Sequence, residues 1–331
     1  MLPNAKAQQI SIVIPTVLRP TIFKTIDSLI KQKNIDRVKV EVVINPLFVD
    51  KKILKKLGKI KNITVRFHTG KYLTAEQSAF HAVATSTSDW IWILGDDDIA
   101  APGSISHILD LVNDSDVDFW LLNCSLKFDQ VPLNYYEVGP SQIQIARSFV
   151  VWQKLGFLTA LTTLSCFLIR KRVLDLKLFE EFHAIQGVYS HSFSLLAMLQ
   201  GSLVGITDRA CVIRNEQGSE DIEKSLRRYS ETIGRDFDSL WIEGVIGLAE
   251  KLSTLTNIPL STLLNYREIE IIKDPFSAFI IQSDISFLVS STKEVSYKRL
   301  MLRSRISSSL EEKLSGGSPG LILRGPIRIT L

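Results

Sequence analysis

The sequence predicts an α/β protein with a mostly parallel central sheet, and three observations support this expectation. Short β-branched apolar runs alternate with helical patterns over the first 125 residues. Single strands that alternate with single helices form parallel sheets with right-handed crossovers, which put helices on both faces. Beyond about residue 220 the alternation stops and helical patterns replace it. We therefore expect a helical appendage after the sheet domain.

The elements follow from the chain in order. The first strand is the apolar run 10–15 (ISIVIP), and residues 21–33 then have apolar side chains at helical spacing. The next expected strands cover residues 38–44, 63–67, 90–94 and 118–124. The helices between them cover residues 50–60, 75–85 and 102–112, the last with Pro102 in its first turn.

The second part of the chain is less regular. We expect a helix at 142–154, a strand at 163–169, a helix at 190–200 and two short strands on either side of Gly205. Helices are expected over 221–255 and 260–310. This organisation predicts a sheet domain over 1–219, with halves 1–125 and 126–219, and a helical C-terminal region over 220–331.

Composition excludes several classes of protein. Apolar residues make up 45% of the 331 residues and charged residues 22%, which is ordinary for a globular chain and excludes a disordered or collagen-like one. The net charge of +4 is too small for a dedicated nucleic-acid binder. No apolar run reaches the ~18–20 residues of a membrane span, and because residues 1–10 lack a charged segment followed by an apolar one, we expect no signal peptide there. The three cysteines fit no metal spacing, and we expect buried, reduced thiols in a cytoplasmic protein.

Three adjacent carboxylates, Asp96, Asp97 and Asp98, follow the apolar run 90–94 directly. Ligands of open α/β sheets bind beyond the carboxyl ends of the strands, so these side chains are candidates for a site. Carboxylates packed together repel one another, and a divalent cation such as Mg²⁺ or Mn²⁺ removes that cost. The alternative is a solvated acidic turn that caps the following helix.

Three pieces of residues 10–125 stand out by their order and spacing: Ser11–Thr16 with Arg19, the run Val43-Ile44-Asn45, and Trp90–Asp98 with Pro102. With these pieces, residues 10–125 resemble the nucleotide-sugar half of family 2 glycosyltransferases, which have the GT-A fold and occur in bacterial surface-polysaccharide assembly. The likeness continues more weakly to about residue 219, through FLTALTTLSCFLIR (157–170) and GVYSH (187–191). It does not cover residues 220–331.

The resemblance implies roles for these residues in binding a nucleoside diphosphate sugar. Pro15, Thr16 and Arg19 would line the pocket of the nucleotide base, and Asn45 stands where the family usually has a base-binding aspartate. This departure leaves the choice of base open.

The resemblance also assigns the acidic cluster. Asp97 would hold Mn²⁺ or Mg²⁺, Asp98 would support the metal or meet the sugar, and Asp96 would face the ribose or the metal's water shell. A late metal-binding histidine of many relatives is absent here, and Glu216 is one candidate to replace it.

The reaction also needs a group that takes the proton of the acceptor hydroxyl. The family places an acid at the start of the helix after the acceptor segment, but this position reads Tyr189-Ser190-His191. Histidine suits general base work at neutral pH, so we expect His191 to be the base. The alternative is a structural histidine at a helix start, with Glu180, Glu181 and His183 as the fallback bases.

These assignments predict a metal-dependent glycosyltransferase that moves a sugar from a nucleoside diphosphate sugar to the hydroxyl of a glycan or lipid-linked acceptor, with inversion. Two alternatives stay open. One is a catalytically silent glycan-binding or scaffold protein on the same fold. The other is a sugar nucleotidyltransferase, although the Gly-rich phosphate loop that such an enzyme needs after its first strand is absent.

The C-terminal segment is basic. Residues 291–331 contain eight lysines and arginines against three glutamates, a surplus of 8 − 3 = +5. Such a segment favours weak attachment to an anionic surface. We therefore expect a cytoplasmic protein that docks on the inner membrane, with a solvated basic helix or a subunit contact as the alternatives.

Overall fold

The computed structural model describes residues 10–47, 49–70, 72, 74–113, 116–128, 131–134, 136–137, 143–155, 161, 163–187, 189–214, 231, 234, 243–263 and 327–328. Four predictions fall outside these residues: most of the helices expected over 221–255 and 260–310, the role of Glu216, and the basic segment 291–331, of which only 327–328 are described.

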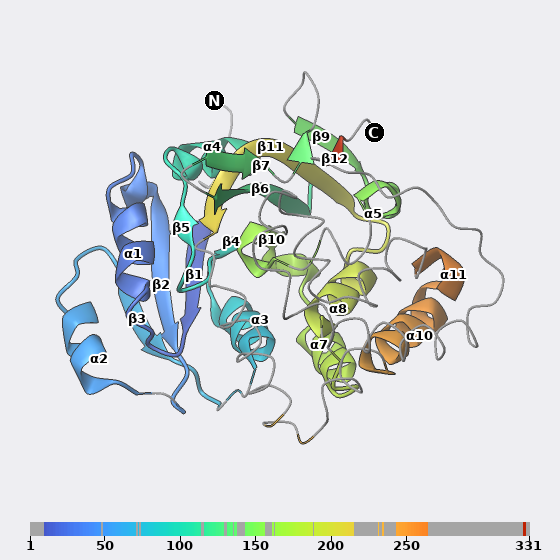
Figure 1. The fold of residues 1–331 in the computed structure, drawn as a ribbon, viewed down its shortest axis with the longest axis horizontal. Helices are drawn as coiled ribbons and strands as arrows, with labels where there is room; N and C mark the ends of the chain where they lie inside the picture. The colour runs from blue at the N-terminus through green and yellow to red at the C-terminus, as the bar shows by residue number, and fades with distance from the viewer. Residues whose placement is uncertain are drawn as a thin grey trace, which may run out of the picture.

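The nucleotide-side half alternates strands and helices as the sequence predicted (Figure 1). Its strands are β1 (Ile10–Thr16), β2 (Val38–Ile44), β3 (Thr64–Phe67), β4 (Trp90–Ile93) and β5 (Ile99–Ala100). Its helices are α1 (Ile22–Ile30), α2 (Lys51–Leu57), α3 (Ala75–Thr85) and α4 (Ser104–Leu111), with a short 3-10 turn η1 (Ile35–Arg37). Figure 1 shows α1 and α2 on one side of the first three strands and α3 on the other.

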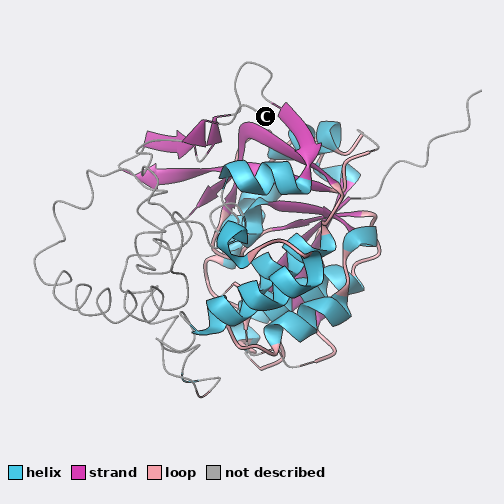
Figure 2. Cartoon of the chain, turned by 90° about the vertical axis from the view of Figure 1, so that its right-hand side faces the viewer, coloured by secondary structure: helices cyan, strands magenta, loops and turns pink. Residues whose placement is uncertain are grey.

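The rest of the chain adds strands and a second group of helices. The strands are β6 (Phe119–Phe128), β7 (Val131–Asn134), β8 (Tyr136–Glu137), β9 (Ile143–Arg147), β10 (Phe167–Arg170), β11 (Leu203–Arg214) and β12 (Ile327–Arg328). The helices are α5 (Ser148–Leu155), α7 (Leu176–His183), α8 (Ser190–Met198), α10 (Gly244–Thr256) and α11 (Leu260–Leu263), with 3-10 turns η2 (Leu164–Cys166) and η3 (Lys171–Val173). Seen from the side in Figure 2, helices stand in front of the strands.

One large mixed sheet organises the molecule, with the strand order β3-β2-β1-β4-β10-β6-β11-β5. The first four strands are parallel, and β10 joins β4 and β6 in antiparallel register. The predicted α/β fold with a parallel core is therefore confirmed. Because β1, β2 and β4 are parallel neighbours, the residues that follow them meet at one edge of the sheet.

Two local predictions in the second half were wrong. Residues 143–147 form a strand that pairs antiparallel with β11, where the sequence pattern suggested the start of a helix over 142–154. Gly205 does not separate two strands, since β11 runs through it without interruption. A β-carbon on Gly205 would lie 2.2 Å from the ring of Trp120, so this glycine permits close packing and marks no turn.

The core is continuous across the molecule. Its largest fully buried side chains include Trp90, Trp92, Trp120 and Trp152. All three cysteines are also buried and free. Helices α10 and α11 contribute side chains to the same core.

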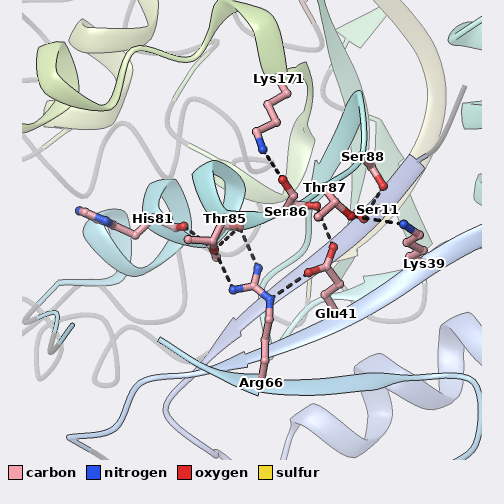
Figure 3. Close-up of polar contacts among 11 residues, drawn as sticks. Ser11, Lys39, Glu41, Arg66, His81, Thr85, Ser86, Thr87, Ser88 and Lys171 are labelled. Atoms are coloured by element: carbon pink, nitrogen blue, oxygen red, sulfur yellow. Dashed lines mark hydrogen bonds and ion pairs between the residues drawn. The ribbon is translucent and has the colours of Figure 1, made fainter. Parts of the chain in front are cut away.

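A buried polar network fixes the end of α3 that lies away from the carboxyl ends of the strands (Figure 3). Arg66 donates to Oε2 of Glu41 at 2.9 Å and to the backbone oxygen of Ala82 at 2.9 Å. Ser86 donates to Oε1 of Glu41 at 2.7 Å. Burial raises the pKa of Glu41, but hydrogen bonds from serines and from Arg66 outweigh it and hold the pKa below its ordinary value. The network ties α3 to β2 and β3.

Candidate active site

Asp96 is the buried centre of the acidic cluster. Its Oδ2 accepts a hydrogen bond from Thr16 Oγ1 at 2.6 Å, and its Oδ1 accepts one from Arg19 Nε at 3.0 Å and a closer one from Nη2 of the same guanidinium. Only 2% of Asp96 is exposed. Both of its oxygens therefore accept from the last residue of β1 and from the loop that follows, and Asp96 positions Thr16 and Arg19 in this conformation.

The loop after β1 is shaped to make these contacts. Leu18 has a φ of 61°, in the left-handed region that costs a bulky side chain free energy. Its amide donates to Thr16 Oγ1 at 2.8 Å, so one hydroxyl supports the turn and contacts Asp96. Pro15 is half-buried at the end of β1. The Arg19 side chain keeps 39% of its surface exposed, which leaves it accessible to a ligand.

Asp97 lies beside the same arginine but is more open. Its Oδ2 is 3.0 Å from Arg19 Nη1, and 22% of its side chain is exposed. Burial, followed by the negative charge of Asp98, raises the pKa of Asp97 to about 6, and Arg19 only partly opposes this. The strand end thus carries more negative charge than one guanidinium compensates.

The space above Gly95 is surrounded by oxygen atoms. A β-carbon on Gly95 would lie 3.0 Å from Asp97 Oδ1, 3.2 Å from Asp98 Oδ2 and 3.2 Å from Ser165 Oγ. Ser165 donates to Asp98 Oδ2 at 2.5 Å and accepts from the Gly95 amide at 2.9 Å. Gly95 therefore leaves room where two carboxylates converge.

This cradle fits a hard divalent cation. Its donors are carboxylate oxygens, which Mg²⁺ and Mn²⁺ prefer, and the two acids repel each other without a cation. Among the described residues no group of three or more histidines, cysteines or acids could hold a metal. Two protein carboxylates nevertheless suffice for an ion that fills its shell with water and substrate phosphate.

The position of Asn45 argues against its predicted contact with the nucleotide base. Asn45 is 2% exposed, and its side-chain amide donates to the backbone oxygen of Tyr72. Its Oδ1 accepts from the Leu47 amide at 3.1 Å. The amide thus links two loops at the sheet edge, and both of its ends are used within the chain.

The position of His191 argues against its predicted role as the base. His191 is 3% exposed, and its Nε2 is 3.0 Å from the backbone oxygen of Leu161. A carbonyl oxygen only accepts, so Nε2 carries a hydrogen there. The other ring nitrogen, Nδ1, lies 2.8 Å from Oε1 of Glu76, although the two are not aligned as a good hydrogen bond. Nε2 is therefore occupied, and Nδ1 is buried against a carboxylate, away from solvent.

The fallback bases lie on α7. Glu180 Oε1 is 2.6 Å from His81 Nε2, and Glu181 pairs with Lys251 at 3.1 Å. The Nε2 atom of His183 is 3.1 Å from Thr74 Oγ1, at the start of α3. Each of these groups connects α7 to a neighbouring helix.

Sequence reasoning missed Ser165 and Glu76. Ser165 lies in an apolar run, which gives no sign that its side chain makes a polar contact. Its backbone oxygen accepts a hydrogen bond from the Trp92 indole at 2.8 Å. Glu76 is an acid in the first turn of α3, a position where acids are common for reasons of the helix dipole. No pattern in the sequence connects either residue to the site.

A comparison with known protein families identifies the family of the chain. The glycosyl transferase family 2 model matches residues 11–176, which is half of the chain and contains the acidic cluster, the loop after β1 and Ser165. The chain belongs to glycosyl transferase family 2, and it is a glycosyltransferase. No curated protein matches the chain in sequence.

Solved structures are similar to this chain at low sequence identity. The structure of TarS from S. aureus is 12% identical, with a TM-score of 0.50 over 91% of this chain and 55% of that one. Residues 1–349 of TarS in complex with UDP-GlcNAc are 12% identical, with a TM-score of 0.49 over 92% of each chain. The mannosyltransferase PcManGT from Pyrobaculum calidifontis, in complex with GDP-Man and Mn²⁺, is 13% identical with a TM-score of 0.49, over 92% of this chain and 80% of that one.

Within the described part of the chain, no helix has both the length and the apolar character needed to cross a membrane.

Proposed function

We propose that this glycosyltransferase moves a sugar from a nucleoside diphosphate sugar to a hydroxyl of a glycan or lipid-linked acceptor, with inversion and with Mn²⁺ or Mg²⁺ bound by Asp97 and Asp98. The observation that carries the proposal is the cradle above Gly95, where Asp97 Oδ1 and Asp98 Oδ2 lie 3.0 and 3.2 Å from one point. The cradle lies at the carboxyl edge of the sheet, where α/β folds bind ligands.

The metal would neutralise the charge that develops on the departing diphosphate. The chain's own groups would bind and orient the donor. Arg19 is exposed on one side and paired with Asp96 and Asp97 on the other, so it can reach a phosphate or the base without leaving the cluster. Asp96 would fix that arginine, and half-buried Pro15 would border the base. Ser165 would keep the Asp98 carboxylate turned toward the cradle.

Thermal shift measurements with several nucleoside diphosphates, with and without Mn²⁺, test donor binding. We expect a shift in melting temperature that depends on both nucleotide and metal. Hydrolysis of a nucleotide-sugar panel then identifies the base and the sugar. The proposal is wrong if no nucleotide shifts the melting temperature in the presence of Mn²⁺ or Mg²⁺ and no donor is consumed.

The kind of acceptor, and the membrane surface on which it is presented, form a separate part of the proposal. The surplus of five positive charges in residues 291–331 supports docking on an anionic inner-membrane surface, where a lipid-linked acceptor would be presented. Each basic residue near such a surface contributes about 1 kcal/mol, and salt screens the attraction. Sedimentation with anionic liposomes at low salt should pull down the full chain but not a chain that lacks residues 291–331. Equal binding to neutral vesicles, or binding to neither, would contradict this part.

A further inference from the structure

The first turn of α8 lacks an acid of its own, but the fold brings one to it from α3. Glu76 and Ser190 are 114 positions apart in sequence, yet Ser190 Oγ donates to Glu76 Oε2. The other carboxylate oxygen, Oε1, lies 2.8 Å from Nδ1 of His191. Tyr189, the residue before the helix, has a φ of 69° and gives no side-chain cap. Glu76 thus occupies the positive end of α8.

Glu76 is ionised at neutral pH in this setting. Burial raises the pKa of Glu76, but the charge of His191 and the hydrogen bond from Ser190 outweigh it, so the pKa lies below its ordinary value. The charge of His183, at the end of α7, acts in the same direction. One oxygen of the carboxylate therefore accepts from Ser190, and the other lies beside His191.

The topology puts this carboxylate at the same edge of the sheet as the acidic cluster. Helix α3 follows β3, so its first turn lies at the carboxyl ends of the strands. The helix packs against β1 and β4, and β4 leads directly to Asp96. The Glu76 side chain keeps 15% of its surface exposed, whereas the His191 side chain keeps 4%. Of this pair, the glutamate is the more accessible member.

We propose that Glu76 is the proton acceptor of glycosyl transfer and that Ser190 and His191 are its positioning residues. The inference rests on the proposed function. The acceptor oxygen forms a bond to the anomeric carbon while the bond from that carbon to the diphosphate breaks, and the bonding pair leaves with the diphosphate. The hydroxyl proton passes to a free lone pair of the Glu76 carboxylate. It is released to solvent after the product departs.

The variant Glu76→Gln tests this assignment. An amide can still accept the hydrogen bond from Ser190, but it cannot take a proton. We expect kcat to fall about 10²–10⁴-fold while KM for the donor and the nucleotide-induced thermal shift stay within about twofold of wild type. Glu250→Gln is the control, since that glutamate is exposed on α10. A kcat within threefold of wild type overturns the inference, and Glu180→Gln then becomes the variant to measure.

Two further measurements keep the test decisive. If Glu76→Gln does not fold, Glu76→Asp takes its place: it keeps the charge but withdraws the carboxylate by one methylene, so kcat should fall at least tenfold. A wild-type rate in Glu76→Asp overturns the inference. Wild-type protein that consumes no nucleotide sugar overturns the proposed function instead, so the two failures are distinguishable.

Discussion

The two parts of the candidate site are assembled in different ways. The donor-side cluster of Arg19, Asp96, Asp97 and Asp98 comes from two short segments, each placed at the sheet edge by the strand before it. The acceptor-side cluster of Glu76, Ser190 and His191 comes from two helices that meet only through long-range packing. The first cluster depends on local sequence, and the second depends on how α3, α7, α8 and α10 pack.

The largest expected effect falls on the donor side. Asp97→Ala should lower kcat by about 10³-fold, because it removes one of two carboxylates that face the metal cradle. It should also abolish the Mn²⁺-dependent part of the nucleotide-induced thermal shift. Asp27→Ala, at an exposed position on α1, is the control. Near-normal turnover of Asp97→Ala in EDTA-treated buffer would contradict the metal assignment.

The packing that supports the acceptor side can be broken at Gly244, the first residue of α10. A β-carbon there would lie 2.5 Å from the Cα of Gly187, in the loop before α8. Gly244→Ala should therefore lower the free energy of unfolding by about 3 kcal/mol, as measured by denaturant titration. Gly58→Ala is the matched control, because its nearest neighbour would be 3.7 Å away. Equal stability of the two variants would show that α10 does not press on this loop.

The variant His191→Gln, which has a smaller expected effect, distinguishes a positioning role of His191 from a role as the base. In His191→Gln the side chain can still donate to the Leu161 oxygen, but the ring nitrogen that faces Glu76 is lost. A positioning role predicts a fall in kcat of about tenfold, with KM for the donor unchanged. Steady-state kinetics measure both quantities, kcat and KM for the donor. A fall as large as that of Glu76→Gln, with that variant itself active, would restore His191 as the base.

The smallest effect concerns pH and His68, the residue that directly follows β3. Burial, followed by the charge of Arg66, lowers the pKa of His68 to about 4. Between pH 6.5 and 4 the unfolded chain binds this proton and the folded chain does not, so folding stability falls as pH falls. His68→Gln keeps a partner for Ser78, which is 2.9 Å from Nε2 of His68.

His68→Gln should lack the pH dependence that His68 contributes to the free energy of unfolding. Between pH 7 and 5.5 the wild type should lose about 1 kcal/mol more stability than His68→Gln, as measured by urea unfolding at each pH. Parallel pH profiles of the two proteins would mean that His68 takes up its proton in the folded state.

Prediction from sequence succeeded where the chemistry was local. The strand β4 and the acids after it are adjacent along the chain, and β-branched runs define β1 and β2, so the sheet edge and its carboxylates were expected. It failed at Gly205, where the uninterrupted strand depends on close packing against the Trp120 ring. It also did not anticipate the hydrogen bond from the Asn45 amide to the Tyr72 oxygen.

The sequence by itself determined the α/β class, the order of the first strands and helices, and the cluster at Asp96–Asp98, because these follow from periodicity and from what directly follows a strand. Only the tertiary structure decided which groups face one another. It enclosed His191 between Leu161 and Glu76, and it set Ser165 beneath Asp98. The physical reason is that burial and hydrogen bonding between distant segments fix a side chain's available atoms, and neither leaves a pattern along the chain.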